Sequence, residues 1–228
     1  MDRPRRWRGK SLISSRGIGI LGGTFDPVHY GHLRMADQVC VALNLAQVRL
    51  MPAGNPYHRT GVPPPAPRLQ RLAMAELAVA EFPRLAVDAR EAISAAPSYT
   101  VDTLGSLRRE LAETPLLLLL GADAFVTLPG WKEWRQLFEL AHIVLISRPG
   151  FKMPEPLPAD LAAEYARRVT AKPGLLRSGA GRIYRQSVDP QPISATAIRE
   201  LIREGKSPDA MLPAAVAHYI ETHHLYRR

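Results

Sequence analysis

Hydrophobic and polar positions along the chain form two repeating kinds of segment. Short, continuously apolar runs such as Leu116–Leu120 and Ile143–Ile146 predict strands that are covered on both faces, as in a parallel sheet. Longer segments with apolar residues three or four apart predict amphipathic helices. The predicted strands are 18–21, 47–52, 84–88, 115–120, 142–147 and 182–186, and the predicted helices are 32–43, 67–81, 98–112, 131–140, 158–168, 194–204 and 213–223. Because strands and helices alternate, we expect an α/β protein with a doubly wound parallel sheet.

Two proline-rich stretches, 53–67 and 148–158, interrupt this alternation and predict long loops. Loops of this length in a compact domain are often lids or binding loops, although a plain solvent-exposed connection is an equal alternative. No internal repeat is visible. At 228 residues, the chain is long enough for one domain with a small appendage.

A glycine-rich turn links the first predicted strand to the first predicted helix. It reads Gly-Gly-Thr-Phe-Asp-Pro-Val-His-Tyr-Gly-His over residues 22–32. Gly22 and Gly23 have no Cβ, so a ligand can approach their backbone closely, and free N–H groups at a helix start favour an anion. His29 and His32 are three residues apart, so both imidazoles can face one group at the helix start. The turn therefore predicts a phosphate site.

A second helix start lies near the other end of the chain, at Ile-Ser-Ala-Thr-Ala-Ile-Arg, residues 193–199. Ser194 occupies the N-cap position, Thr196 lies in the first turn, and Arg199 follows one turn later. Taken alone, this stretch is best interpreted as a capped surface helix. Together with the glycine-rich turn, its hydroxyls and guanidinium predict a second contact to one polyphosphate.

Charge and cysteine content narrow the classes of function. The formal charge is +9, but six basic side chains lie in residues 1–17 against one acid, Asp2. We interpret residues 1–16 as a disordered basic extension and residues 17–228 as a single domain, whose helical C-terminal part begins near residue 190. The remaining positive charge suits an anionic small molecule as well as it suits nucleic acid, the rival class of ligand. Cys40, the single cysteine, and the lack of a long apolar run are typical of a cytoplasmic protein.

The two motifs together resemble the nucleotidyltransferase superfamily that is defined by a His-x-Gly-His turn, and within it the chain is most similar to the bacterial nicotinate-nucleotide adenylyltransferases. The resemblance runs from about Gly17 to the end of the chain. Further matching segments are Met51-Pro52, Pro56, His58-Arg59, Pro97–Leu104, Gly121–Asp123, Trp131, Ser147–Gly150, Leu212-Pro213, Tyr219-Ile220 and Leu225–Arg227. It implies a Rossmann-like nucleotidyltransferase fold with a small C-terminal helical part.

The resemblance also implies a reaction, in which ATP and nicotinate mononucleotide give deamido-NAD and pyrophosphate, with Mg²⁺ accompanying ATP as the only cofactor. It implies a catalytic set of His29, His32 and Arg199, and an ATP-binding set of Gly22, Gly23, Thr24, Phe25, Gly121, Asp123, Ser194 and Thr196. The implied acceptor-binding set is Tyr99, Thr100, Trp131, Arg148, His58 and Arg59. No protein-bound metal site is expected, because the two histidines have no cysteine partner and no His-Glu-x-x-His helix is present in the sequence. Nucleic acid is not expected because much of the charge lies in the basic extension, and a membrane is not expected because no apolar run is long enough.

Alternatives remain at this stage. Another acceptor, nicotinamide mononucleotide or phosphopantetheine, would use the same two phosphate motifs. Trp131 could be a core residue rather than a stacking platform for the pyridine ring. The sequence leaves the oligomeric state open.

Overall fold

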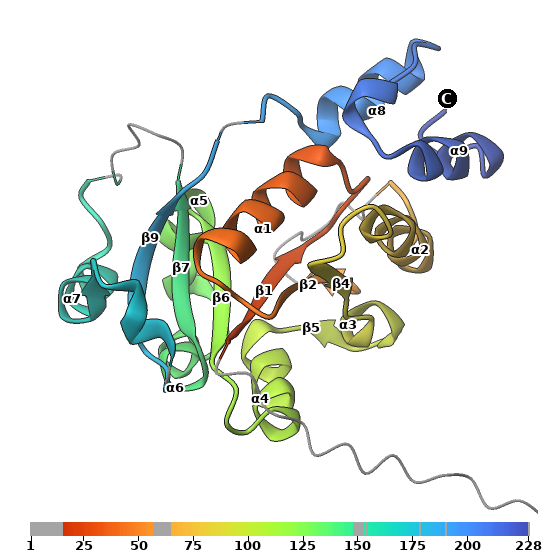
Figure 1. Cartoon of the computed structure of the whole chain (residues 1–228). Helices are drawn as coiled ribbons and strands as arrows, with labels where there is room; N and C mark the ends of the chain where they lie inside the picture. The colour runs from red at the N-terminus through yellow and green to blue at the C-terminus, as the bar shows by residue number, and fades with distance from the viewer. Residues whose placement is uncertain are drawn as a thin grey trace, which may run out of the picture.

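The computed structural model describes residues 16–56, 65–147, 153, 155–177, 179–189 and 191–227. Its main sheet has seven strands in the order β4-β2-β1-β6-β7-β9-β8, and every pair is parallel (Figure 1). The strands are β1 (Ile18–Gly23), β2 (Gln47–Pro52), β4 (Leu85–Val87), β6 (Leu116–Gly121), β7 (His142–Ser147), β8 (Val169–Thr170) and β9 (Ile183–Ser187). The predicted doubly wound parallel sheet is therefore confirmed.

The continuously apolar strands are explained by packing on both faces of this sheet. Along β6, Leu117 and Leu119 belong to one buried cluster, whereas Leu116, Leu118 and Leu120 belong to the other. Successive side chains of a strand point to opposite faces, so a strand covered on both sides needs an apolar residue at every position.

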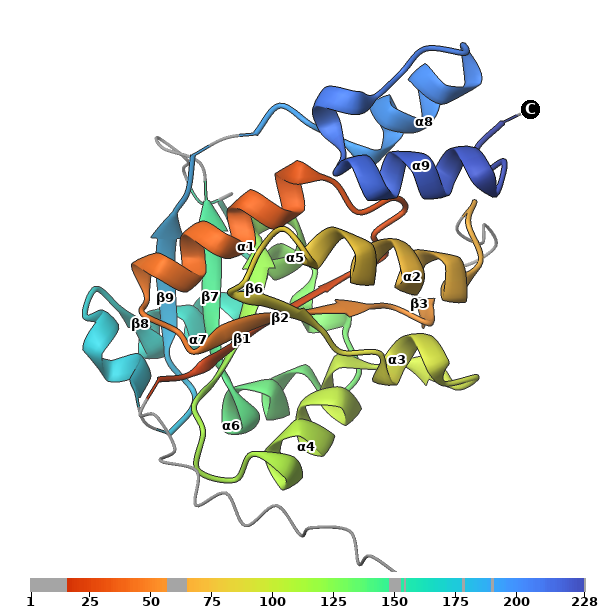
Figure 2. The same cartoon turned by 45° about the vertical axis from the view of Figure 1, so that its right-hand side comes forward.

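Helices cover both faces (Figure 2). The first face carries α1 (Tyr30–Ala42) and α2 (Arg68–Val79), and the second carries α4 (Thr100–Glu110), α5 (Ala122–Val126), α6 (Leu137–Leu140) and α7 (Ala159–Arg168). The buried cluster of the first face extends to α8 (Ala195–Arg203) and α9 (Ala214–Thr222). α8 and α9 follow the last strand and lie together beyond one end of the sheet, with α9 packed against α2 (Figure 2). Within the described residues, no helix is long and apolar enough to cross a membrane.

Several predicted elements need correction. The predicted helix 131–140 is instead a 3₁₀ turn, Trp134–Gln136, followed by the short α6. Glu133 has a left-handed backbone with φ 48°, which prevents a regular helix from extending back to Trp131. The helix predicted at 98–112 begins only at Thr100, because β5 (Pro97–Ser98) pairs in parallel with β3 (Asn55–Pro56).

The sequence analysis also missed α3 (Arg90–Ile93), α5 and β8, which are short elements of two to five residues. Segments this short carry too few residues to show a period. Of the two predicted loops, 57–64 and 148–152 lie outside the described residues. The proposed boundary at residue 16 stays a prediction, because residues 1–15 also lie outside them.

Candidate active site

The glycine-rich turn begins where β1 ends and finishes as the N-terminus of α1. The helix begins at Tyr30, two residues earlier than predicted, so His29 is its N-cap and His32 lies in its first turn. His29 has an extended backbone, and its side chain makes no capping hydrogen bond. The imidazole is therefore not used to complete the helix. Phe25 has a left-handed backbone, φ 49°, a strained state for a bulky residue that often marks a functional turn.

The imidazoles of His29 and His32 stack on each other, with ring centroids 3.7 Å apart and an interplanar angle of 27°. The Phe25 ring meets His32 edge-on, with centroids 5.0 Å apart. Gly31 is required between them, because a Cβ there would lie 2.8 Å from His29 Nδ1. A larger residue at position 31 would therefore displace the His29 ring from its stack on His32.

Burial controls the charge of this pair. It lowers the pKa of His29 to about 4, and burial together with the charge of His29 lowers the pKa of His32 well below its ordinary value. Both imidazoles are therefore neutral near pH 7. The Nδ1 atoms of both rings are buried, and neither has a hydrogen-bond partner among the described residues. Buried polar atoms normally have partners, so this pair has the character of a ligand-binding group.

The second predicted helix start lies against the first one. Ser194 caps α8, accepting a hydrogen bond from the Ala197 N–H at 3.2 Å, as expected. Arg199 donates from Nη1 to the carbonyl of Asp26 at 2.6 Å and from Nη2 to Thr196 Oγ1 at 3.2 Å. Two segments 173 residues apart in sequence are joined by this contact. Figure 1 shows the start of α8 beside the N-terminal end of α1.

A separate cavity of about 220 Å³ opens at the carboxyl ends of β1 and β6, next to the start of α4. Ligands of doubly wound sheets bind at this edge. Six of the predicted site residues line the cavity: Gly22, Gly23, Thr24, Thr100, Gly121 and Trp131. Tyr99 is the N-cap of α4, and its ring faces Lys132 Nζ, 4.8 Å from the ring centroid. Asp123 lies close by, because a Cβ on Gly121 would come within 2.7 Å of its Oδ1.

Three polar residues of the cavity wall were missed by the sequence analysis: Glu91, Ser98 and Thr103. Thr103 donates to Glu91 Oε1 at 2.6 Å, and burial raises the pKa of Glu91. The sequence could have indicated Glu91 by its position, because it is an acidic residue that follows a strand at the ligand-binding edge of the sheet.

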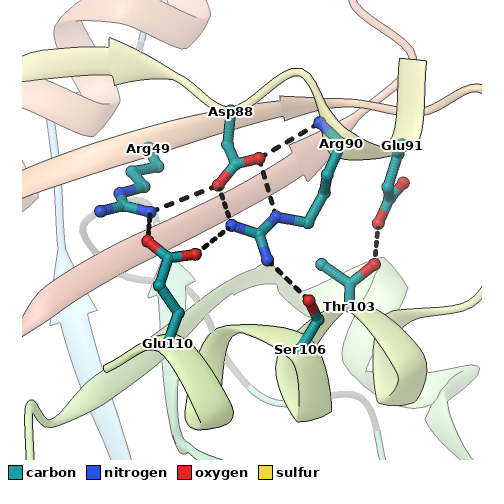
Figure 3. A network of polar contacts seen from close by, with 7 residues as sticks. All are labelled: Arg49, Asp88, Arg90, Glu91, Thr103, Ser106 and Glu110. Atoms are coloured by element: carbon teal, nitrogen blue, oxygen red, sulfur yellow. Dashed lines mark hydrogen bonds and ion pairs between the residues drawn. The ribbon is translucent and has the colours of Figure 1, made fainter. Parts of the chain in front are cut away.

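A polar network next to Glu91 fixes the position of α4 (Figure 3). Arg90 pairs with Asp88 at 2.7 Å and Glu110 at 2.8 Å, and it donates to Ser106 at 3.0 Å. Arg49 of β2 also reaches Asp88, at 3.3 Å. These contacts tie the edge of the sheet and α3 to the outer face of α4, and α4 in turn presents Thr100 to the cavity.

Three predicted acceptor contacts, His58, Arg59 and Arg148, lie outside the described residues, so their roles stay predictions. Phe25 does not line the cavity, and it contacts the histidine pair instead.

The chain is a nucleotidyltransferase, with stacked histidines at one helix start and an arginine reaching over from another on a parallel doubly wound sheet. Residues 20–201 match the family model described as cytidylyltransferase-like, and the chain belongs to this family. Its relatives place it in the nicotinate-nucleotide adenylyltransferase branch.

Two of these relatives carry the printed name "Probable nicotinate-nucleotide adenylyltransferase". The one from Halorhodospira halophila is 51% identical over 205 residues, which is 88% of this chain and 91% of the relative. The one from Dechloromonas aromatica is 47% identical over 216 residues, 93% of this chain and 99% of the relative. The resemblance inferred from the motifs is thereby confirmed.

Among solved structures, the chain is similar to the Plasmodium falciparum nicotinic acid mononucleotide adenylyltransferase complexed with NaAD. The TM-score is 0.68 at 17% identity, with 92% of this chain and 97% of that chain covered. The same enzyme complexed with APC gives a TM-score of 0.65. At such low identity, these two structures support the fold alone.

Proposed function

We propose that the protein transfers the adenylyl group of ATP to nicotinate mononucleotide, giving nicotinate adenine dinucleotide and pyrophosphate in NAD biosynthesis. An oxygen of the acceptor phosphate forms a bond to the α-phosphorus of ATP. The bond from that phosphorus to the bridging oxygen breaks, and its electron pair leaves with pyrophosphate. A phosphate monoester is already a nucleophile, so positioning and charge neutralisation are the main tasks of the protein.

The contact of Arg199 with the Asp26 carbonyl is the observation that carries this proposal. It supports a triphosphate that lies between the two helix starts. On one side it would meet His29 and His32, and on the other Arg199, Ser194 and Thr196. A bound phosphate group is stabilised by a helix N-terminus and by charge-assisted hydrogen bonds from a guanidinium group.

The neutral state of the imidazoles fits this role. In that state each ring has one N–H to donate to a phosphate oxygen. The negative charge of a bound triphosphate raises the pKa of both rings, so proton uptake would accompany binding. Positive charge would then be present where pyrophosphate develops its own negative charge.

The cavity next to α4 is proposed as the acceptor site. Backbone N–H groups at the start of α4, around Tyr99 and Thr100, suit the carboxylate of the nicotinate ring. Trp131 would stack on the pyridine ring. Gly121 and Asp123, which follow β6 at the same edge, would contact the adenosine of ATP. These roles are taken from the family resemblance, and His58, Arg59 and Arg148 are proposed as further contacts to phosphates.

Mg²⁺ is proposed to arrive with ATP, as part of the substrate. Among the described residues, no three His, Cys, Asp or Glu side chains gather in a way that could hold a metal ion. Mg²⁺ typically keeps several waters and is bound by substrate phosphates with only one or two protein carboxylates. We further propose a cytoplasmic location, in keeping with the lone cysteine Cys40.

Pyrophosphate release from Mg·ATP tests the proposal. Three acceptors are compared over the same range of concentrations: nicotinate mononucleotide, nicotinamide mononucleotide and phosphopantetheine. We expect the highest kcat/KM with nicotinate mononucleotide. Higher kcat/KM with either of the other two would change the assigned acceptor, and no release with any of them would reject the function.

A further inference from the structure

A buried hydrogen bond connects the segment after α9 to the glycine-rich turn. The Tyr226 hydroxyl donates to Asp26 Oδ1 at 2.6 Å, although the two residues are 200 positions apart. Asp26 is 4% exposed and Tyr226 is 8% exposed. Asp26 lies three residues before His29, so Tyr226 contacts the turn that carries the imidazole pair without belonging to it.

Asp26 is where three distant parts of the chain contact this turn: Tyr226, Ala66 and Arg199. Its Oδ1 also accepts the Ala66 N–H at 3.3 Å, just before α2. Its carbonyl accepts Arg199 Nη1. Any movement of Asp26 would therefore displace the backbone that leads to His29 and the acceptor that holds Arg199.

The backbone around Tyr226 is held in place by packing. Tyr226 has a left-handed conformation, φ 64°, which is costly for an aromatic residue and persists only where the surroundings enforce it. Leu225 and Tyr226 belong to the same buried cluster as Val216 and Ile220 of α9. This packing fixes the hydroxyl at a defined point against the Asp26 carboxylate.

The charges at this point explain why a donor is needed. Burial and the Asp26 carboxylate raise the pKa of Tyr226 far above its ordinary value, so the hydroxyl keeps its proton. The guanidinium groups of Arg199 and Arg71 lie nearby, on the carbonyls of Asp26 and Thr24, and their charges act on the pKa of this hydroxyl in the opposite direction. Without the hydroxyl, the carboxylate would lose its short donor and could pair with Arg199. That pairing would withdraw Arg199 from its carbonyl acceptor and from a bound phosphate.

We propose that Tyr226 is a positioning residue of the active site, which holds the Asp26 carboxylate so that the histidine turn and Arg199 keep their places. The inference rests on the proposed function, because the groups it positions are those assigned to the triphosphate. It also makes the segment after α9 part of the active-site architecture.

The direct test is Tyr226→Phe, which removes only the hydroxyl. We expect kcat/KM for ATP to fall on the order of 10-fold, since one hydrogen bond to a charged group is lost. KM for nicotinate mononucleotide should stay within about twofold, because the acceptor cavity is not contacted. The matched control is Tyr219→Phe, which removes a hydroxyl from the neighbouring helix and keeps the ring that stacks on His223.

A second variant separates positioning from stability. Leu45→Ala should lower Tm more than Tyr226→Phe, because it removes buried apolar volume just before β2, at the edge of the sheet opposite the site, and leaves the packing around Tyr226 in place. Assayed below both Tm values, Leu45→Ala should keep more of its kcat/KM than Tyr226→Phe. Adding Asp26→Asn to Tyr226→Phe should cost less than the product of the two single effects.

Equal loss in Leu45→Ala and Tyr226→Phe, or a Tyr226→Phe enzyme within twofold of wild type, would overturn the inference. The wild-type enzyme is measured with nicotinate mononucleotide in the same series. A silent wild type would reject the proposed function, whereas an active wild type matched by Tyr226→Phe would reject the inference alone.

Discussion

At the scale of single residues, burial determines what the histidine pair can do. His29 is 5% exposed, and the two rings are stacked on each other at the start of α1. A pair of imidazoles so close together cannot easily carry two positive charges without an anion between or beside them. The burial and stacking that lower the pKa values of His29 and His32 in the free protein therefore also favour the binding of a phosphate.

One prediction concerns turnover. His32→Ala should lower kcat by ~100- to 1,000-fold, because one preorganised group that stabilises developing charge is removed. Pyrophosphate release measures the loss. His218→Ala, an imidazole removed from α9, is the control and should stay near wild type. A His32→Ala enzyme with nearly normal turnover would exclude the assigned role.

A second residue-scale prediction concerns acid stability. The pKa of His29 in the folded state is about 4, below its ordinary value of 6.5, so the ring is buried in its neutral form. Its full contribution to stability is present above pH 6.5 and is lost as the pH falls toward 4. The loss amounts to about 3 kcal/mol for this ring alone. Urea unfolding at several pH values measures it, and His29→Asn should show a flatter pH dependence over that window.

At the scale of elements, the positions of three loops depend on one side chain of α2. Arg71 is 1% exposed and donates to the carbonyls of Thr24 at 2.6 Å, Gly54 at 3.0 Å and Ala66 at 3.2 Å. Thr24 belongs to the glycine-rich turn, and Gly54 lies next to the acceptor cavity, where its N–H donates to Ser98 Oγ. α2 therefore joins the two proposed substrate sites through backbone carbonyls.

Replacing the Arg71 side chain should strongly destabilise the fold. Arg71→Met should lower the free energy of unfolding by about 3–5 kcal/mol, because three carbonyls, two of them in buried hydrogen bonds, lose their donor. Chemical denaturation measures the change. Arg84→Met, which breaks an exposed pair with Asp37, is the control and should alter stability little. A small effect of Arg71→Met would show that water replaces the guanidinium in this position.

At the scale of the whole molecule, part of the net positive charge lies far along the chain from the proposed chemistry. Five of the basic side chains lie within residues 1–15, whereas the residues proposed for catalysis lie between His29 and Arg199. Deletion of residues 1–15 should therefore leave kcat and both KM values within about twofold of the full chain. Steady-state kinetics of the two proteins test this. Salt-dependent binding of duplex DNA that survives the deletion would instead support nucleic-acid binding by the folded part.

The sequence by itself determined the sheet, because a strand that is buried on both faces needs the unbroken apolar runs seen in β6 and β7. It also indicated the two helix starts that are proposed to bind phosphate, since glycines, a helix cap and histidine spacing are local features of the chain. The helix predicted over residues 131–140 was wrong, because the left-handed backbone of Glu133, which prevents it, is not indicated by any local pattern in the sequence.

Only the tertiary structure decided how the site is put together. Three features of the site depend on contacts between distant segments. Arg199 donates to the backbone carbonyl of Asp26, the Tyr226 hydroxyl donates to the Asp26 carboxylate, and Glu91 lies in the cavity wall. Such contacts leave no period or spacing in the sequence, since they arise from how the packed sheet and helices bring distant residues together. The residue types of the site are therefore encoded locally, whereas its geometry belongs to the fold as a whole.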